Sequence, residues 1–160
     1  MKQLLFIFIV LFRLSAPAQD QVVKDTISLI YQLDGVTING HTTWKKGDKI
    51  VLGNLIFKGN TSFLEVSSKP LLDELLTVMI NNPKLKVEIQ GHICCYPDRT
   101  HPISKERAQV VYEYLLDNGI KRSRIRYKDF GGRNPIYPIP EQTNEQRNAN
   151  RRVEIEVLEN

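Results

Sequence analysis

The stretch LKVEIQGH, residues 85–92, decides the fold of this chain because its side chains alternate in polarity. Leu85, Val87 and Ile89 are apolar, and charged or polar residues stand between them, as in a β-strand with one face on a core and the other in solvent. A polar loop follows over residues 91–102. A helix then begins at Ser104, which we expect to cap it, with its apolar side at Ala108, Val111 and Leu115.

The chain before this unit predicts a strand and a helix. Residues 50–57 are largely apolar and end at a Gly-Asn pair, so they predict a strand. Residues 67–70, Ser-Ser-Lys-Pro, predict a helix start, with a hydroxyl cap and a proline in the first turn. Apolar residues then recur at helical spacing on one face until Asn82-Pro83: Leu71, Leu72, Leu75, Leu76 and Met79.

The chain after it predicts the remaining elements. Residues 118–120, Asn-Gly-Ile, end the second helix, since glycine adopts the left-handed cap conformation readily. Residues 125–127 predict a third strand that runs into a Gly-Gly pair, residues 141–149 a short helix, and residues 153–157 a last strand with alternating polarity. The economical packing is an α+β two-layer fold, with two main helices on one face of a mixed four-stranded sheet.

The amino terminus predicts export. Lys2 precedes an apolar run over residues 4–12, and a small-x-small Ala-Pro-Ala site follows at 16–18. This pattern is typical of a secretory signal peptide, and the run is too short for a permanent membrane helix. We therefore divide the chain into a signal peptide (1–18), a short β-rich extension or linker with turn signals (19–48) and the main domain (49–160), and expect no transmembrane segment in the mature chain.

The composition is that of a soluble globular domain, with 41% hydrophobic and 25% charged residues. Without Lys2 and Arg13 the chain carries 20 basic and 18 acidic residues, a net charge of +2. The sequence has no run of basic residues that could contact the phosphate backbone of a nucleic acid, so nucleic acid is not an expected partner.

The sequence has two cysteines, Cys94 and Cys95, which are adjacent and cannot cross-link distant parts of the fold. In an oxidising compartment they could be buried thiols, a disulfide between neighbours or an intermolecular bridge.

Five fragments in order resemble the OmpA-like carboxy-terminal domain, over about residues 50–158. They are Gly91-His92, the ISKERA stretch at 103–108, Gly119-Ile120, Gly131-Gly132 with Asn134-Pro135, and NRRVEI at 150–155. The resemblance implies non-covalent, non-catalytic binding of peptidoglycan through the diaminopimelate residue of its stem peptide. It also implies a place in the periplasm, at the outer membrane or cell wall of a diderm bacterium.

The resemblance also implies which residues bind. The family grips the zwitterionic end of diaminopimelate with an arginine and an aspartate. The arginine corresponds to Arg107, but Cys94 stands at the acidic position, and the loop is about two residues short with Thr100 at a usual asparagine position. We expect Asp98 to replace the missing carboxylate, and Ser104 and Arg151 to lie at the site, with Arg151 and Arg152 on opposite faces of the last strand.

Arg107 is also a candidate on physical grounds. Free N–H groups at a helix start attract an anion, and an arginine there adds a bidentate donor for a carboxylate. The alternatives are a solvated arginine or one paired with Glu106, and for Asp98 an ordinary turn residue.

Other functions have weaker patterns. His92, Cys94, Cys95 and His101 could hold a metal, but adjacent cysteines fit a tetrahedral site poorly, so we expect neither metal nor cofactor. Catalytic dithiols are usually Cys-x-x-Cys at a helix start, and no hydrolase constellation stands out, so we expect no enzyme. The main alternative is an interaction module that docks an outer-membrane or periplasmic protein.

Overall fold

The computed structural model describes residues 44–53, 55–59, 61–97 and 101–160. The predicted signal peptide, almost all of the predicted extension, and Asp98 lie outside these residues.

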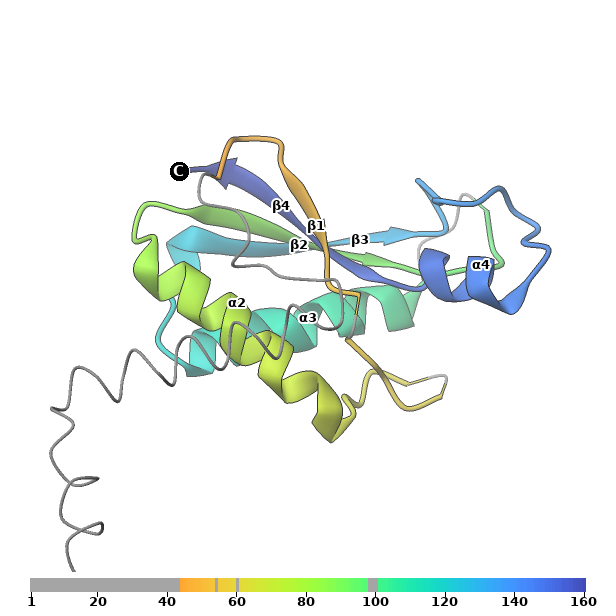
Figure 1. Ribbon diagram of the computed structural model, residues 1–160, viewed down its shortest axis with the longest axis horizontal. Helices are drawn as coiled ribbons and strands as arrows, with labels where there is room; N and C mark the ends of the chain where they lie inside the picture. The colour runs from red at the N-terminus through yellow and green to blue at the C-terminus, as the bar shows by residue number, and fades with distance from the viewer. Residues whose placement is uncertain (1–43, 54, 60, 98–100) are drawn as a thin grey trace, which may run out of the picture. The chain divides into compact units, whose positions relative to one another are not determined.

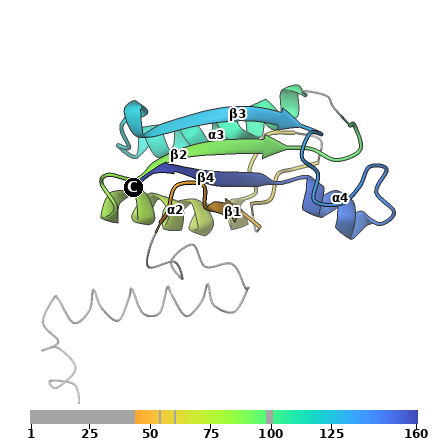
Figure 2. The same cartoon turned by 90° about the horizontal axis from the view of Figure 1, so that it is seen from above.

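Four strands form one mixed sheet in the order β1-β4-β2-β3. They are β1 (Lys49–Val51), β2 (Lys86–His92), β3 (Ile125–Gly131) and β4 (Val153–Glu159). β2 pairs with β3 in parallel, and β4 pairs antiparallel with both β1 and β2. The helices α2 (Lys69–Asn81) and α3 (Pro102–Asp117) lie on the same face of the sheet (Figures 1 and 2). The predicted two-layer α+β fold is confirmed.

Three short helices complete the domain. Two are 3₁₀ turns, Val66–Ser68 (η2) before α2 and Arg122–Arg124 (η3) before β3. The third, α4 (Asn144–Asn150), precedes β4 and lies beyond the carboxyl ends of β2 and β3 (Figure 2). None of the described helices is long and apolar enough to cross a membrane.

The core lies between the helices and the inner face of the sheet. Trp44, before β1, is 8% exposed and joins it, so the packing of the domain includes residues just before the predicted boundary. Its other members include the strand and helix residues predicted from periodicity: Leu71, Leu72, Leu75, Met79, Leu85, Val87, Ile89, Ala108, Val111, Leu115, Val153, Ile155 and Val157.

The first strand is shorter than predicted. Leu52 still donates its N–H to Val153 O at 2.9 Å, but the chain then turns at Gly53 and leaves the sheet. Phe57 pairs with Leu64 in an isolated bridge instead. Both side chains pack on the core, so the apolar run reflects a core-packed loop, which periodicity alone does not separate from a strand.

The outer face of the sheet is not the solvated face that the alternation predicted. Gln90 is fully buried and Glu88 is 7% exposed. The Gln90 amide donates to the carboxylates of Glu88 and Glu156, and Arg126 pairs with Glu88 at 2.7 Å. These contacts satisfy the Gln90 amide donor and the Glu88 carboxylate but leave Gln90 Oε1 without a hydrogen bond.

Candidate functional site

Arg107 lies in the second turn of α3 and is 9% exposed. Its Nε donates to Thr61 O at 3.0 Å, and its guanidinium carbon lies 4.8 Å from the centre of the Phe57 ring. Both partners belong to the loop between β1 and α2. Arg107 is therefore packed, neither solvated nor paired with Glu106.

Arg107 has a second cation nearby and no described acid as a partner. Burial lowers the pKa of Arg107, and the positive charge of Arg151 lowers it further. Among the described residues, no carboxylate oxygen lies within 4.0 Å of either guanidinium. A carboxylate can pair with a guanidinium through two hydrogen bonds, so an anion near these arginines would offset their repulsion.

Arg152 has a structural role instead. Its Nε lies 2.6 Å from Glu154 Oε1, and its side chain is 7% exposed. Arg151 is exposed and donates to Asn148 at 2.6 Å. Of the two consecutive arginines, Arg151 is therefore the one whose charge acts on Arg107.

Ser104 is buried, and it is not the helix cap. The helix begins at Pro102, and the cap is His101, whose Nδ1 accepts the Ile103 N–H at 3.2 Å. The Ser104 hydroxyl lies 2.6 Å from Asp129 Oδ1 and 2.8 Å from His101 O. Its contact with a ligand stays a prediction, since in this structure the hydroxyl links the start of α3 to the end of β3.

The outer side of the α3 start carries a shallow hollow of about 470 Å³, lined by His101, Pro102, Lys105, Glu106, Gln109 and Asp129. Arg107 is absent from its lining and faces the loop between β1 and α2. The hollow is therefore separate from the arginine pair.

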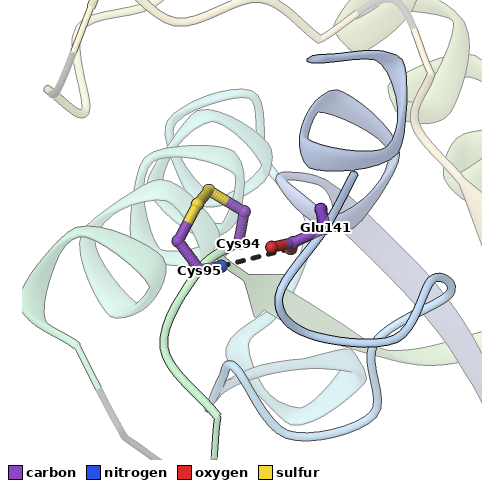
Figure 3. A group of neighbouring side chains, drawn as sticks. All are labelled: Cys94, Cys95 and Glu141. Atoms are coloured by element: carbon purple, nitrogen blue, oxygen red, sulfur yellow. Dashed lines mark hydrogen bonds between the residues drawn. A yellow bond between two sulfur atoms is a disulfide. The ribbon is translucent and has the colours of Figure 1, made fainter. Parts of the chain in front are cut away.

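Cys94 and Cys95 form a disulfide with each other, one of the three states that the sequence allowed. Cys95 has a positive φ of 74°, and its N–H donates to Glu141 Oε1 at 3.1 Å (Figure 3). Sequence reasoning missed Glu141, because it lies 46 residues away in a polar segment with no distinctive spacing.

Glu141 is a buried, ionised carboxylate. It is 4% exposed, and its Oε1 also accepts from Asn150 Nδ2 at 2.7 Å. Burial by itself would raise the pKa of Glu141, but hydrogen bonds from Asn150 and from backbone N–H groups, together with the charge of Arg147, hold it below the ordinary value. The same Asn150 accepts the N–H groups of Ile136 and Tyr137, so it fixes the loop that carries Glu141.

The histidines and cysteines of the 91–102 region do not converge on one point. His92 stacks on Phe130 with ring centres 5.1 Å apart, while His101 caps α3. In the described part of the chain, ligand atoms of Cys94, Cys95 and Glu141 lie within 4.8 Å of one another. Both sulfurs are joined in the disulfide, and a metal requires thiolates, so this group does not fit a metal.

The structure defines a small two-layer α+β domain that carries a buried arginine in its second main helix. The chain belongs to the OmpA family, whose model matches residues 56–151. A curated relative, "Probable lipoprotein YiaD" of Escherichia coli, is 32% identical over 125 residues. The match covers 72% of this chain and 54% of the relative, so the chain spans about half of that protein's length.

Solved structures share the fold. The periplasmic domain of Helicobacter pylori MotB aligns with a TM-score of 0.62 and 20% identity, over 74% of this chain and 77% of that chain. The cell wall anchor of the T6SS from Pseudomonas aeruginosa aligns with a TM-score of 0.57 and 24% identity, over 70% and 80%. The resemblance deduced from the sequence fragments is thereby confirmed at the level of family and fold.

Proposed function

We propose that this protein binds peptidoglycan non-covalently and without catalysis, and so anchors or positions itself in the cell envelope. The observation that carries the proposal is the buried Arg107 beside Arg151 without a described counter-ion. The carboxylate at the end of a diaminopimelate stem would supply the missing negative charge through charge-assisted hydrogen bonds. Membership of the OmpA family and the likeness to a cell wall anchor support the same ligand.

The location follows from the ligand. Peptidoglycan lies in the periplasm of a diderm bacterium, and the predicted signal peptide at residues 1–18 would bring the chain there. We therefore propose a periplasmic protein associated with the cell wall or outer membrane.

A protein-interaction module on the same fold is the second candidate. The observation in its favour is the exposed apolar surface of the loop and turn before α2, where Phe63 is 72% and Val66 87% exposed. Such side chains often mark contact surfaces. This surface neighbours the arginine pair through Thr61, so the two functions are compatible.

The test is co-sedimentation of residues 19–160 with insoluble diaminopimelate-containing sacculi at low salt. Arg107→Ala removes a charge-assisted pair that contributes about 1.5–3 kcal/mol, so binding should weaken roughly tenfold to a hundredfold. Arg122→Ala, which removes an exposed arginine in η3, is the matched control and should bind like the wild type.

Two outcomes contradict the proposal. If the wild-type protein stays in the supernatant, it does not bind peptidoglycan, and if soluble muropeptides are released, it is a hydrolase. Because Arg107 packs on Phe57, the melting temperature of Arg107→Ala must be measured as well.

A further inference from the structure

Glu141 carries a buried negative charge that forms no ion pair with a described residue, although the charge of Arg147 acts on it. No Lys, Arg or His nitrogen of the described residues lies within 4.0 Å of its carboxylate. The guanidinium of Arg147 donates to the backbone oxygen of Glu141 at 3.2 Å, and only its charge acts on the carboxylate. The neutral donors Cys95 N–H and Asn150 Nδ2 both use Oε1.

The Glu141 carboxylate lies close to the position where the family has an acidic residue and this chain has Cys94. The resemblance implies an acid where this chain has Cys94. In the structure a carboxylate oxygen of Glu141 lies within 4.8 Å of the sulfurs of Cys94 and Cys95 (Figure 3). A negative charge therefore remains at this end of β2, although it comes from the loop before α4 instead of the loop after β2.

The acid and the arginine pair belong to one connected structure. Asn150, which donates to Glu141, is followed directly by Arg151, and the charge of Arg151 acts on Arg107. Glu141, Arg107 and Arg151 are thus linked through Asn150, and none of the three forms an ion pair within 4.0 Å with a described residue of opposite charge. A free amino acid end, with an ammonium and a carboxylate on one carbon, is complementary to the carboxylate and to the guanidinium groups.

We propose that Glu141 binds the ammonium of the diaminopimelate side chain while Arg107 and Arg151 bind its carboxylate. This inference rests on the proposed function and assigns the acidic half of its site. An unpaired buried charge is unfavourable, so an ammonium at Glu141 relieves an existing cost instead of breaking an ion pair. The side chain needs no rearrangement, because Cys95 and Asn150 already hold it in place.

The decisive variant is Glu141→Gln, measured with the wild-type protein on native sacculi and on sacculi whose free amino groups have been acetylated. The glutamine oxygen can still accept from Cys95 and Asn150, so the change removes the charge and keeps these hydrogen bonds. Glu145→Gln, on the exposed side of α4, is the matched control. We expect Glu141→Gln to bind native sacculi at least tenfold more weakly than the wild type, and Glu145→Gln to bind normally. Acetylation of the sacculi should weaken the binding only of proteins that keep Glu141.

The outcomes separate this inference from the proposed function. Absence of wild-type binding would remove both. Wild-type binding that depends on Arg107 but is insensitive to acetylation would overturn the role of Glu141 alone, whether or not the variant folds. The role of Glu141 is also overturned if Glu141→Gln keeps its melting temperature and binds normally while Asp98→Asn binds weakly, since Asp98 would then be the acid.

Discussion

At the scale of single residues, the polar groups of this domain fall into two kinds. Glu154 and Glu88 have arginine partners within 2.7 Å, and these pairs hold the outer face of the sheet. Arg107 and Glu141 are about as buried, yet neither forms an ion pair within 4.0 Å with a described residue. Since an unpaired buried charge is unfavourable for folding, these are the two residues that we propose for ligand binding.

The ion pair of Glu154 with Arg152 predicts that the stability of the domain depends on pH. Burial by itself would raise the pKa of Glu154, but the nearby His92, whose Nε2 lies 3.6 Å away, and the hydrogen bond and charge of Arg152 lower it from 4.5 to about 2. A carboxyl whose pKa is lower in the folded state stabilises the fold fully above its unfolded pKa. This stabilisation is lost as the pH falls from about 4.5 toward 2.

We therefore expect the wild-type protein to lose on the order of 2 kcal/mol more than Glu154→Gln between pH 6 and pH 2.5, after allowance for solvent screening. Urea unfolding at a series of pH values measures the difference. Parallel curves for the two proteins would show that Glu154 contributes nothing to acid sensitivity.

At the scale of elements, the close approach of β2 and α3 fixes the start of the helix that carries Arg107. A Cβ added at Gly91 would lie 1.9 Å from Ser104 O and 3.3 Å from the Ala108 Cβ. Both neighbours belong to α3, and the nearer atom is backbone, so the strand and helix would have to separate. Gly91 therefore keeps the first turns of α3 against the sheet.

Gly91→Ala should destabilise the domain by more than about 2 kcal/mol, because overpacking against backbone cannot be relieved by a side-chain rotation. It should also weaken sacculus binding if any folded protein remains, since Arg107 would move with the helix. Gly47→Ala is the control: a Cβ there meets no atom within 4 Å, and only the positive φ of 93° adds strain, about 1 kcal/mol. Chemical denaturation of both variants tests the expectation, and equal losses would refute the packing argument.

At the scale of the whole molecule, the sequence was informative where the physics is local and periodic. The alternation at 85–90 and the leucine spacing at 71–79 predicted β2 and α2, and five ordered fragments predicted the family. Contacts between distant segments could not be read in this way. Thr61 and Phe57 contact Arg107 from 46 and 50 residues away, and Glu141 reaches Cys95 across a similar separation. No fixed sequence spacing predicts these contacts, so the partners of Arg107 and the position of Glu141 beside Cys95 became visible only in the folded structure.

The disulfide between Cys94 and Cys95 joins neighbouring residues, and this predicts how the domain responds when the bond is reduced. Disulfides stabilise proteins largely by closing loops in the unfolded chain, but Cys94 and Cys95 are neighbours, so their bond closes no loop of consequence. Reducing it adds two protons and two electrons to the sulfurs, and it frees Cys95 to leave its positive φ, which is unfavourable for a residue other than glycine. The effect should therefore stay local, at the Cys95 N–H that donates to Glu141.

We expect a phosphine reductant to shift the melting temperature by less than about 3 °C, while amide hydrogen exchange at Cys95 becomes faster. The Cys94→Ala/Cys95→Ala double variant should behave like the reduced wild type in both measurements. A fall of more than about 8 °C on reduction would show that this bond stabilises the whole domain, and unchanged exchange at Cys95 would show that the turn keeps its conformation without the bond.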